Sequence, residues 1–60
     1  MKFNVGDKVK WPRNFVDNVW HGTVISAHNS EMRITWNTVR PGQEDTIPRS
    51  RFHEFVKENP

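Results

Sequence analysis

The sequence predicts a small all-β domain, a five-stranded barrel with one short helical turn before its last strand. Three observations support this prediction. Apolar residues alternate with polar ones in short runs instead of recurring at helical spacing. Glycine, proline and asparagine separate these runs, as expected of turns. The length of 60 residues is enough for one small domain. Because the sequence has no cysteine, packing or self-association must hold that domain together without disulfides.

The first two strands are expected at residues 8–11 and 19–27. In "KVKW", Val9 and Trp11 lie on one face and Lys8 and Lys10 on the other, and the glycine of the preceding "VGD" suits a tight turn. "VWHGTVISA" is rich in β-branched residues and is the longest expected strand. Its alternation places one set of residues on a single face: Trp20, Gly22, Val24 and Ser26.

The second half of the chain predicts a hairpin, a further strand and a helical turn. "HNSE", around Asn29, has the composition of a hairpin turn, and the following strand, "MRITW" at 32–36, alternates Met32, Ile34 and Trp36 with polar residues. A Pro-Gly pair at 41–42 marks the next turn, and a short strand at 44–47 ends at a proline. "PRSRFHEF" then suits one turn of 3₁₀- or α-helix leading into a last short strand near Val56.

This order of elements is typical of an SH3-like small barrel. The OB-fold is the alternative architecture, but it usually needs longer strands and a helix between the third and fourth, for which "NTVRPGQ" is too short. The N-terminus lacks the apolar run of a signal peptide, and no segment approaches the roughly 20 apolar residues that span a membrane. We therefore expect a soluble cytoplasmic protein that does not contact membranes.

Several segments resemble the Tudor and KOW type of SH3-like domain. They are "FNVGDKVKW", "WHGTVIS", "MRITWN" and "EDTIPRSRF", and the resemblance extends from residue 3 to residue 55. Tudor-type domains bind methylated Lys or Arg in an aromatic cage, because a methylated cation keeps its charge and is easily desolvated. The resemblance implies that the cage positions are Trp11, Trp20 and Trp36, whereas the place of a fourth aromatic residue offers only Val39. The alternative is that Trp11 and Trp36, in phase with Val9 and Ile34, fill the core.

The segments "VGDKV", "WHGTV" and "PGQEDTIP" are also similar to the plasmid-borne type II dihydrofolate reductases, SH3-like barrels that work as tetramers around a shared pore. The catalytic Val-Gln-Ile-Tyr segment of that family corresponds here to Glu44, Asp45, Thr46 and Ile47, so neither its Gln nor its Tyr is present. Acidic side chains would also repel an anionic cofactor and an anionic substrate. We therefore predict neither reductase activity nor a cofactor.

Other catalytic and metal sites are not expected either. His21, His28 and His53 lie in separate predicted elements without the spacing of metal ligands. The serines lack the setting of a nucleophile, and the Glu44-Asp45 pair is better explained as solvated charge on a strand edge. The sequence predicts a protein that is not an enzyme.

Basic residues suggest a nucleic-acid partner. The net charge is only +2, but seven of the nine positive side chains fall near the expected first strand, the hairpin strand and the last turns: Lys8, Lys10, Arg13, Arg33, Arg40, Arg49 and Arg51. With Trp20 and Trp11 as stacking surfaces, they could hold backbone phosphates and bases. The alternative is that these charges merely solvate alternate strand positions and protect edges from aggregation.

The sequence therefore predicts a non-catalytic binding module whose partner is nucleic acid or a nucleic-acid-bound assembly. A peptide carrying methylated Lys or Arg is the alternative partner, and self-association through Trp20 and Phe15 into a dimer or tetramer is the third hypothesis. The expected interface comprises the first loop, the end of the third strand and the loop over residues 37–43. Its predicted binding residues are Trp11, Trp20, Trp36, Lys8, Lys10, Arg13, Phe15, Arg40 and Arg49.

Overall fold

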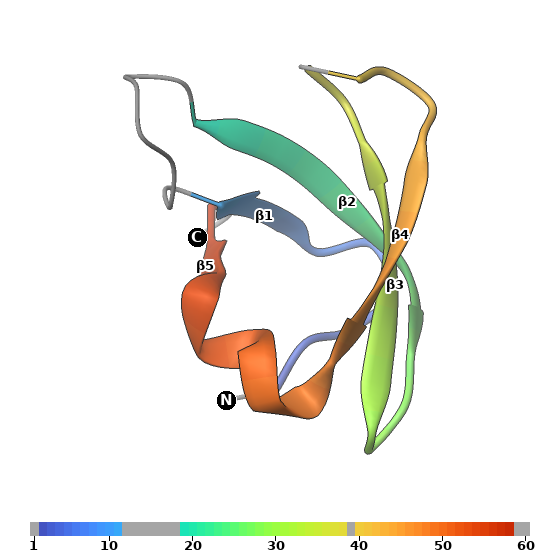
Figure 1. Ribbon diagram of the computed structural model, residues 1–60, viewed down its shortest axis with the longest axis vertical. Helices are drawn as coiled ribbons and strands as arrows, with labels where there is room; N and C mark the ends of the chain where they lie inside the picture. The colour runs from blue at the N-terminus through green and yellow to red at the C-terminus, as the bar shows by residue number, and fades with distance from the viewer. Residues whose placement is uncertain (1, 12–18, 39, 59–60) are drawn as a thin grey trace.

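The computed structural model describes residues 2–11, 19–38 and 40–58. Within them, five strands form one antiparallel sheet in the order β4-β3-β2-β1-β5. In chain order the elements are β1 (Lys8–Trp11), β2 (Trp20–Ala27), β3 (Glu31–Trp36), β4 (Glu44–Pro48), the 3₁₀-helix η1 (Arg49–Glu54) and β5 (Val56–Lys57). The sheet is strongly curved, and η1 joins its two outermost strands (Figure 1). The predicted all-β class and the short helical turn before the last strand are confirmed.

The alternation of apolar residues located every strand to within about a residue of its observed ends. β1 has the predicted bounds, β2 begins one residue later, and β3 begins one residue earlier. Pro48 is the last residue of β4, where it pairs with Glu31. The end of an edge strand tolerates proline, which has no backbone N–H to donate. The N–H of the next residue, Arg49, donates to the Ser30 carbonyl.

The core fills the concave side of the sheet. It consists of nine buried side chains: Phe3, Val9, Val24, Met32, Ile34, Trp36, Ile47, Phe52 and Phe55. The strand residues among them share one face, and Phe52 and Phe55 enter from η1 and the residue after it. The spacing of three between these phenylalanines turns both rings toward the sheet, so η1 covers a core that the strands alone would leave open to water.

A β-bulge in β2 corrects one expectation of the sequence. Val24 pairs with Ile34, but Ser26 rather than Ile25 pairs with Arg33, so Ile25 is the extra residue. One added residue reverses the alternation beyond that point. As a result Ala27 packs against the core, whereas Ser26 shares the outer face with Arg33. The prediction that Ser26 lies on the face of Trp20 and Val24 was wrong for this reason.

Two glycines provide the backbone conformations that the turns require. Gly6 has φ 94° in a turn closed by the Asp7 N–H, which donates to the Asn4 carbonyl at 3.0 Å. Gly42 has φ 84° and follows Pro41, and the Gln43 N–H donates to the Arg40 carbonyl at 3.0 Å. Proline followed by a glycine of positive φ is the pattern of a type II turn. This turn sets the register of β3 against β4.

Gly22 has a different role, because its missing side chain makes room for Trp36. The two residues are paired across β2 and β3. A Cβ atom at position 22 would lie 3.0 Å from the Thr35 carbonyl oxygen and 3.3 Å from Cε3 of Trp36. Since one of these atoms is backbone and the other belongs to a rigid buried ring, neither can move away cheaply.

We therefore expect Gly22→Ala to lower the free energy of unfolding by about 1–3 kcal/mol, the usual cost of overpacking a core. Urea denaturation followed by tryptophan fluorescence measures it. Thr46→Ala, an exposed change in β4, is the control and should stay within about 0.5 kcal/mol of the parent. Equal stability of the Gly22→Ala variant and the parent would contradict the close packing of Trp36.

Candidate functional site

The three tryptophans of the chain lie together on the concave side of the sheet. Trp11 and Trp20 are paired across β1 and β2, and Trp36 lies opposite Gly22 on β3. The ring centroids are 5.7 Å apart for Trp11 and Trp20, 5.0 Å for Trp20 and Trp36, and 6.1 Å for Trp11 and Trp36. We call these three residues the tryptophan cluster. Strands β1, β2 and β3 therefore bring the three rings into mutual contact.

The members of the tryptophan cluster differ in exposure. Trp36 is 2% exposed and belongs to the core, whereas Trp11 and Trp20 are half-buried and pack against it. Trp11 stacks on Phe55 with an interplanar angle of 11°, and Trp20 stands nearly perpendicular to Trp11, at 84°. Trp36 is thus a core residue beneath the site, and only Trp11 and Trp20 present ring surface to a ligand.

Two carboxylates accept hydrogen bonds from two of the three indole N–H groups of this cluster. Nε1 of Trp36 donates to Oδ2 of Asp45, and Nε1 of Trp11 donates to Oε1 of Glu54 at 3.2 Å. Asp45 lies on β4, the strand after Trp36, whereas Glu54 reaches Trp11 from the end of η1, 43 residues further along the chain. A carboxylate at the edge of an indole also increases the negative potential around the rings, which favours cations over anions.

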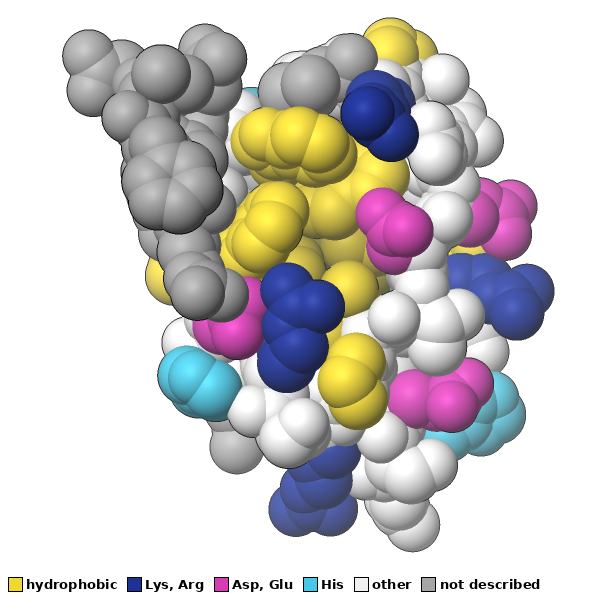
Figure 2. Space-filling view, in the orientation of Figure 1, with side chains coloured by type: hydrophobic (Ala, Val, Ile, Leu, Met, Phe, Trp, Pro, Cys, Tyr) yellow, Lys and Arg dark blue, Asp and Glu magenta, His cyan; other side chains and the backbone are white. Residues whose placement is uncertain are grey.

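A guanidinium already lies against one of the exposed rings. Cζ of Arg51 is 5.7 Å from the centroid of Trp11, and its Nη2 is 3.1 Å from Oε1 of Glu54. The Arg51 side chain is 41% exposed, so it lies at the border of the cluster rather than within the core. Figure 2 shows an apolar surface on the concave side with basic and acidic side chains along its border. The site therefore combines ring faces, carboxylates and one resident cation.

The basic residues predicted to join the tryptophans are distributed over several parts of the molecule. Lys8 and Lys10 alternate with Val9 and Trp11, which places them on the convex face of β1, away from the cluster. Arg40 lies in the turn between β3 and β4, and Arg49 begins η1, where Nη1 donates to the Asn29 carbonyl. Arg33 is on the convex face, 3.9 Å from Glu44. Arg13, Phe15 and Val39 lie outside the described residues.

The histidines are separated, as their positions in the sequence predicted. Nδ1 of His21 contacts Glu58 at 2.9 Å, Nε2 of His28 contacts Ser26 at 3.1 Å, and His53 is an exposed residue of η1. The described part of the chain contains no group of three His, Cys, Asp or Glu residues that could hold a metal ion. Nor does it contain a helix that is long and apolar enough to cross a membrane.

Arg51 was expected among the basic residues, but as a phosphate contact and not as a cation against Trp11. Sequence reasoning missed the other three contributors to the site: Asp45, Glu54 and Phe55. One of them could have been found, because Asp45 has the same parity as the buried Ile47 in β4 and so faces the concave side. The sequence predicted only solvated charge on a strand edge; Asp45 is indeed exposed on the edge strand β4, but its carboxylate also accepts the Trp36 indole N–H. Glu54 and Arg51 depend on how η1 docks, for which the local sequence carries no signal.

No protein-family model, curated protein or solved structure matches the chain. The chemistry of the site is therefore argued from its own residues.

The hydrogen bond between Trp36 and Asp45 should contribute measurably to stability. Asp45→Ala leaves the indole N–H of a buried ring without its acceptor, and we expect a loss of about 1–3 kcal/mol in the free energy of unfolding. Asp45→Asn keeps an oxygen that can accept the bond and should lose less than half as much. Urea denaturation of both variants measures the difference. Equal losses in the two variants would mean that the charge of Asp45, rather than the hydrogen bond, matters.

Proposed function

We propose that the chain is a non-catalytic binding module that holds a methylated Lys or Arg side chain of a peptide against Trp20 and Trp11. The observation that carries this proposal is the resident guanidinium of Arg51, 5.7 Å from the Trp11 centroid and paired with Glu54. This contact is an intramolecular example of the recognition that an external cation would use. We also propose that the five-stranded sheet forms an SH3-like barrel.

A methylated cation suits this site for physical reasons. Methylation retains the positive charge and weakens hydration, so ring faces compete well with water for it. Trp11 and Trp20 meet at 84° and so present two surfaces at a right angle, a corner in which one ammonium group can contact both. Asp45 and Glu54 lie at the edges of the neighbouring rings and add attraction for positive charge.

A peptide is favoured over nucleic acid by the arrangement of charge. The same two carboxylates would repel phosphates near the rings, and Lys8 and Lys10 lie on the opposite face of β1. A single strand that stacked on Trp20 could not reach those lysines without passing around the edge of the sheet. Base stacking and phosphate contacts would therefore need separate surfaces.

We expect a short peptide carrying trimethyllysine to bind more tightly than the same peptide with unmodified lysine. Trp20→Ala should weaken binding of the methylated peptide roughly 2- to 30-fold, the range that one cation–π contact supplies. Trp20→Phe keeps a ring and should retain part of the affinity. Ile25→Ala, an exposed change in the bulge of β2, is the matched control and should bind like the parent. Titration calorimetry measures all four proteins, and an absence of binding at millimolar peptide would contradict the proposal.

Nucleic-acid binding is the second candidate. It is favoured by five basic side chains that form no ion pair with another described residue: Lys2, Lys8, Lys10, Arg40 and Arg49. Phosphate contacts by free cations would make binding weaken steeply with salt.

The combined variant Lys8→Gln and Lys10→Gln should then bind an oligothymidine less tightly and reduce the slope of log affinity against log salt by roughly 1.4, about 0.7 for each lost contact to a single strand. Fluorescence anisotropy of a labelled oligonucleotide measures the slope. No binding at low salt would contradict this second function and leave the first intact.

Arg51→Gln separates the two functions. Removing the resident guanidinium frees a face of Trp11, so binding of the methylated peptide should be retained or strengthened. For nucleic acid the same change removes a positive charge beside the rings and should weaken binding. Calorimetry and anisotropy on the same preparation of this variant show which ligand follows its expected direction.

A further inference from the structure

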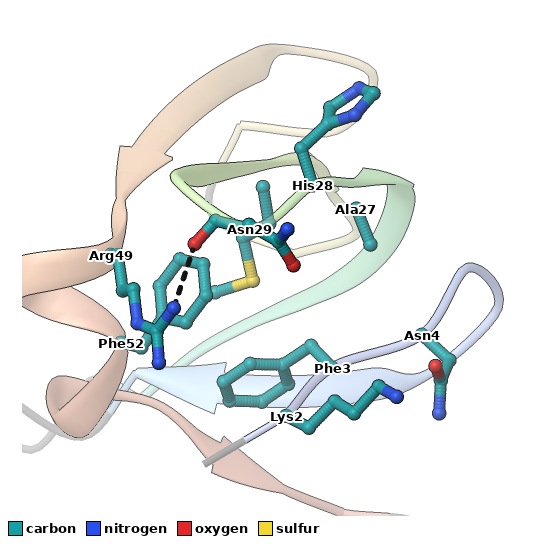
Figure 3. A pocket seen from close by; sticks show the side chains of 9 residues that line it. Lys2, Phe3, Asn4, Ala27, His28, Asn29, Arg49 and Phe52 are labelled. Carbon is teal, nitrogen blue, oxygen red and sulfur yellow. Dashed lines mark hydrogen bonds between the residues drawn. The ribbon is translucent and has the colours of Figure 1, made fainter.

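A cavity lies at the other end of the concave side, away from the tryptophan cluster. It has a volume of about 420 Å³ and is bounded by the segment before β1, the β2–β3 hairpin and η1 (Figure 3). None of the residues of the tryptophan cluster lines it. Its volume is in the lower part of the range of small-ligand pockets, roughly 300–1,000 Å³.

The floor of this cavity is apolar and well ordered by packing. Phe3, Met32 and Phe52 line it and are all buried, and the rings of Phe3 and Phe52 meet edge to face at 5.5 Å. Met32 is fully buried and closes the cavity from beneath, whereas Phe3 and Phe52 keep 4% and 8% of their surface exposed. Such a floor suits an aromatic ring or a branched alkyl group.

The border of the cavity is basic. Lys2 and Arg49 line it together with His28, and none of the described residues that line it is acidic. Arg49 Nη1 donates to the Asn29 carbonyl at 3.3 Å, which holds the guanidinium beside the opening (Figure 3). That is the one hydrogen bond that the guanidinium makes to a described residue, and most of its N–H groups therefore remain available to a ligand. Lys2 forms no ion pair with the described part of the chain.

We infer that this cavity binds a small organic anion whose aromatic body lies against Phe3 and Phe52 while its carboxylate or phosphate meets Arg49 and Lys2. Two features select for this class. The apolar floor gives no advantage to an inorganic anion, and the basic border repels an organic cation. The guanidinium can contact a carboxylate or a phosphate through two parallel N–H groups, whereas the Lys2 ammonium adds a mobile charge. This site is independent of the proposed recognition of methylated side chains, because it shares no lining residue with the tryptophan cluster.

The experiment is a titration of the ¹⁵N-labelled chain followed by two-dimensional NMR. The probes are benzoate, phenyl phosphate, benzylamine and inorganic phosphate. We expect saturable shifts at the amides of Phe3, Ala27, Asn29 and Phe52 with the two aromatic anions, and no change in the three indole N–H signals. Benzoate and phenyl phosphate differ only in the anionic group, so the tighter of the two identifies the preferred headgroup.

Arg49→Gln should weaken binding of the aromatic anions about tenfold, as expected for the loss of a charge-assisted contact. Arg33→Gln removes the same charge from the convex face and is the matched control, which should bind like the parent. Lys2→Gln tests the border independently of the Asn29 contact, in case Arg49→Gln alters folding. Its affinity for benzoate should fall severalfold while the rest of the spectrum stays unchanged.

Several results would overturn the inference. Binding of benzylamine as tight as that of benzoate would remove the role of the basic border, and so would a loss of affinity in Arg33→Gln as large as that in Arg49→Gln. Inorganic phosphate binding as tightly as phenyl phosphate would remove the role of the apolar floor. Shifts centred on the indole signals would place the anion at the tryptophan cluster instead. Each of these outcomes leaves the calorimetric test of the methylated peptide unaffected.

Discussion

The packing of the Trp36 indole against Gly22 is the contact on which the core and the candidate site both depend. Any side chain at position 22 would come within 3.0 Å of the Thr35 carbonyl and 3.3 Å of the indole. With glycine there, the ring can lie across β2 and reach Trp11, Trp20 and Phe55. Burial of Trp36 in turn leaves Trp11 and Trp20 above it at the surface. The close approach of β2 and β3 at Gly22 thus buries Trp36 in the core, and the same arrangement leaves Trp11 and Trp20 as an aromatic surface above it.

The strands could be predicted from sequence because an alternating pattern fixes the face of each residue once the strand is assigned. The bounds of β1 and the turns at Gly6 and Gly42 followed from such local rules. The bulge at Ile25 did not, because one inserted residue leaves composition and propensity unchanged and appears only in the pairing with β3. Ser26 was therefore assigned to the wrong face, although every residue before the bulge was assigned correctly.

The candidate site was predictable in part, for a related reason. Strand phase brings Trp11, Trp20 and Trp36 to one face, but it cannot tell which ring a distant segment will cover. Here Phe55 stacks on Trp11 and Trp36 is enclosed, whereas Trp20 keeps part of its surface free. The number of basic residues does not show whether their side chains lie on the same face as the tryptophans. The alternation of side chains along β1 places Lys8 and Lys10 on the face opposite Trp11, and the net charge does not reveal this separation.

η1 connects the two ends of the concave side and contributes two residues to each. Arg49 and Phe52 line the basic cavity, whereas Arg51 and Glu54 contact the tryptophan cluster. The two ends differ in electrostatic character. One has at its border the Arg49 guanidinium, which forms no ion pair with another described residue, whereas at the other end two carboxylates accept hydrogen bonds from indole N–H groups beside Arg51. Because Phe52 and Phe55 anchor this short segment in the core, neither end can shift without disturbing the packing of the other. A substitution in η1 should therefore be interpreted for both ends at once.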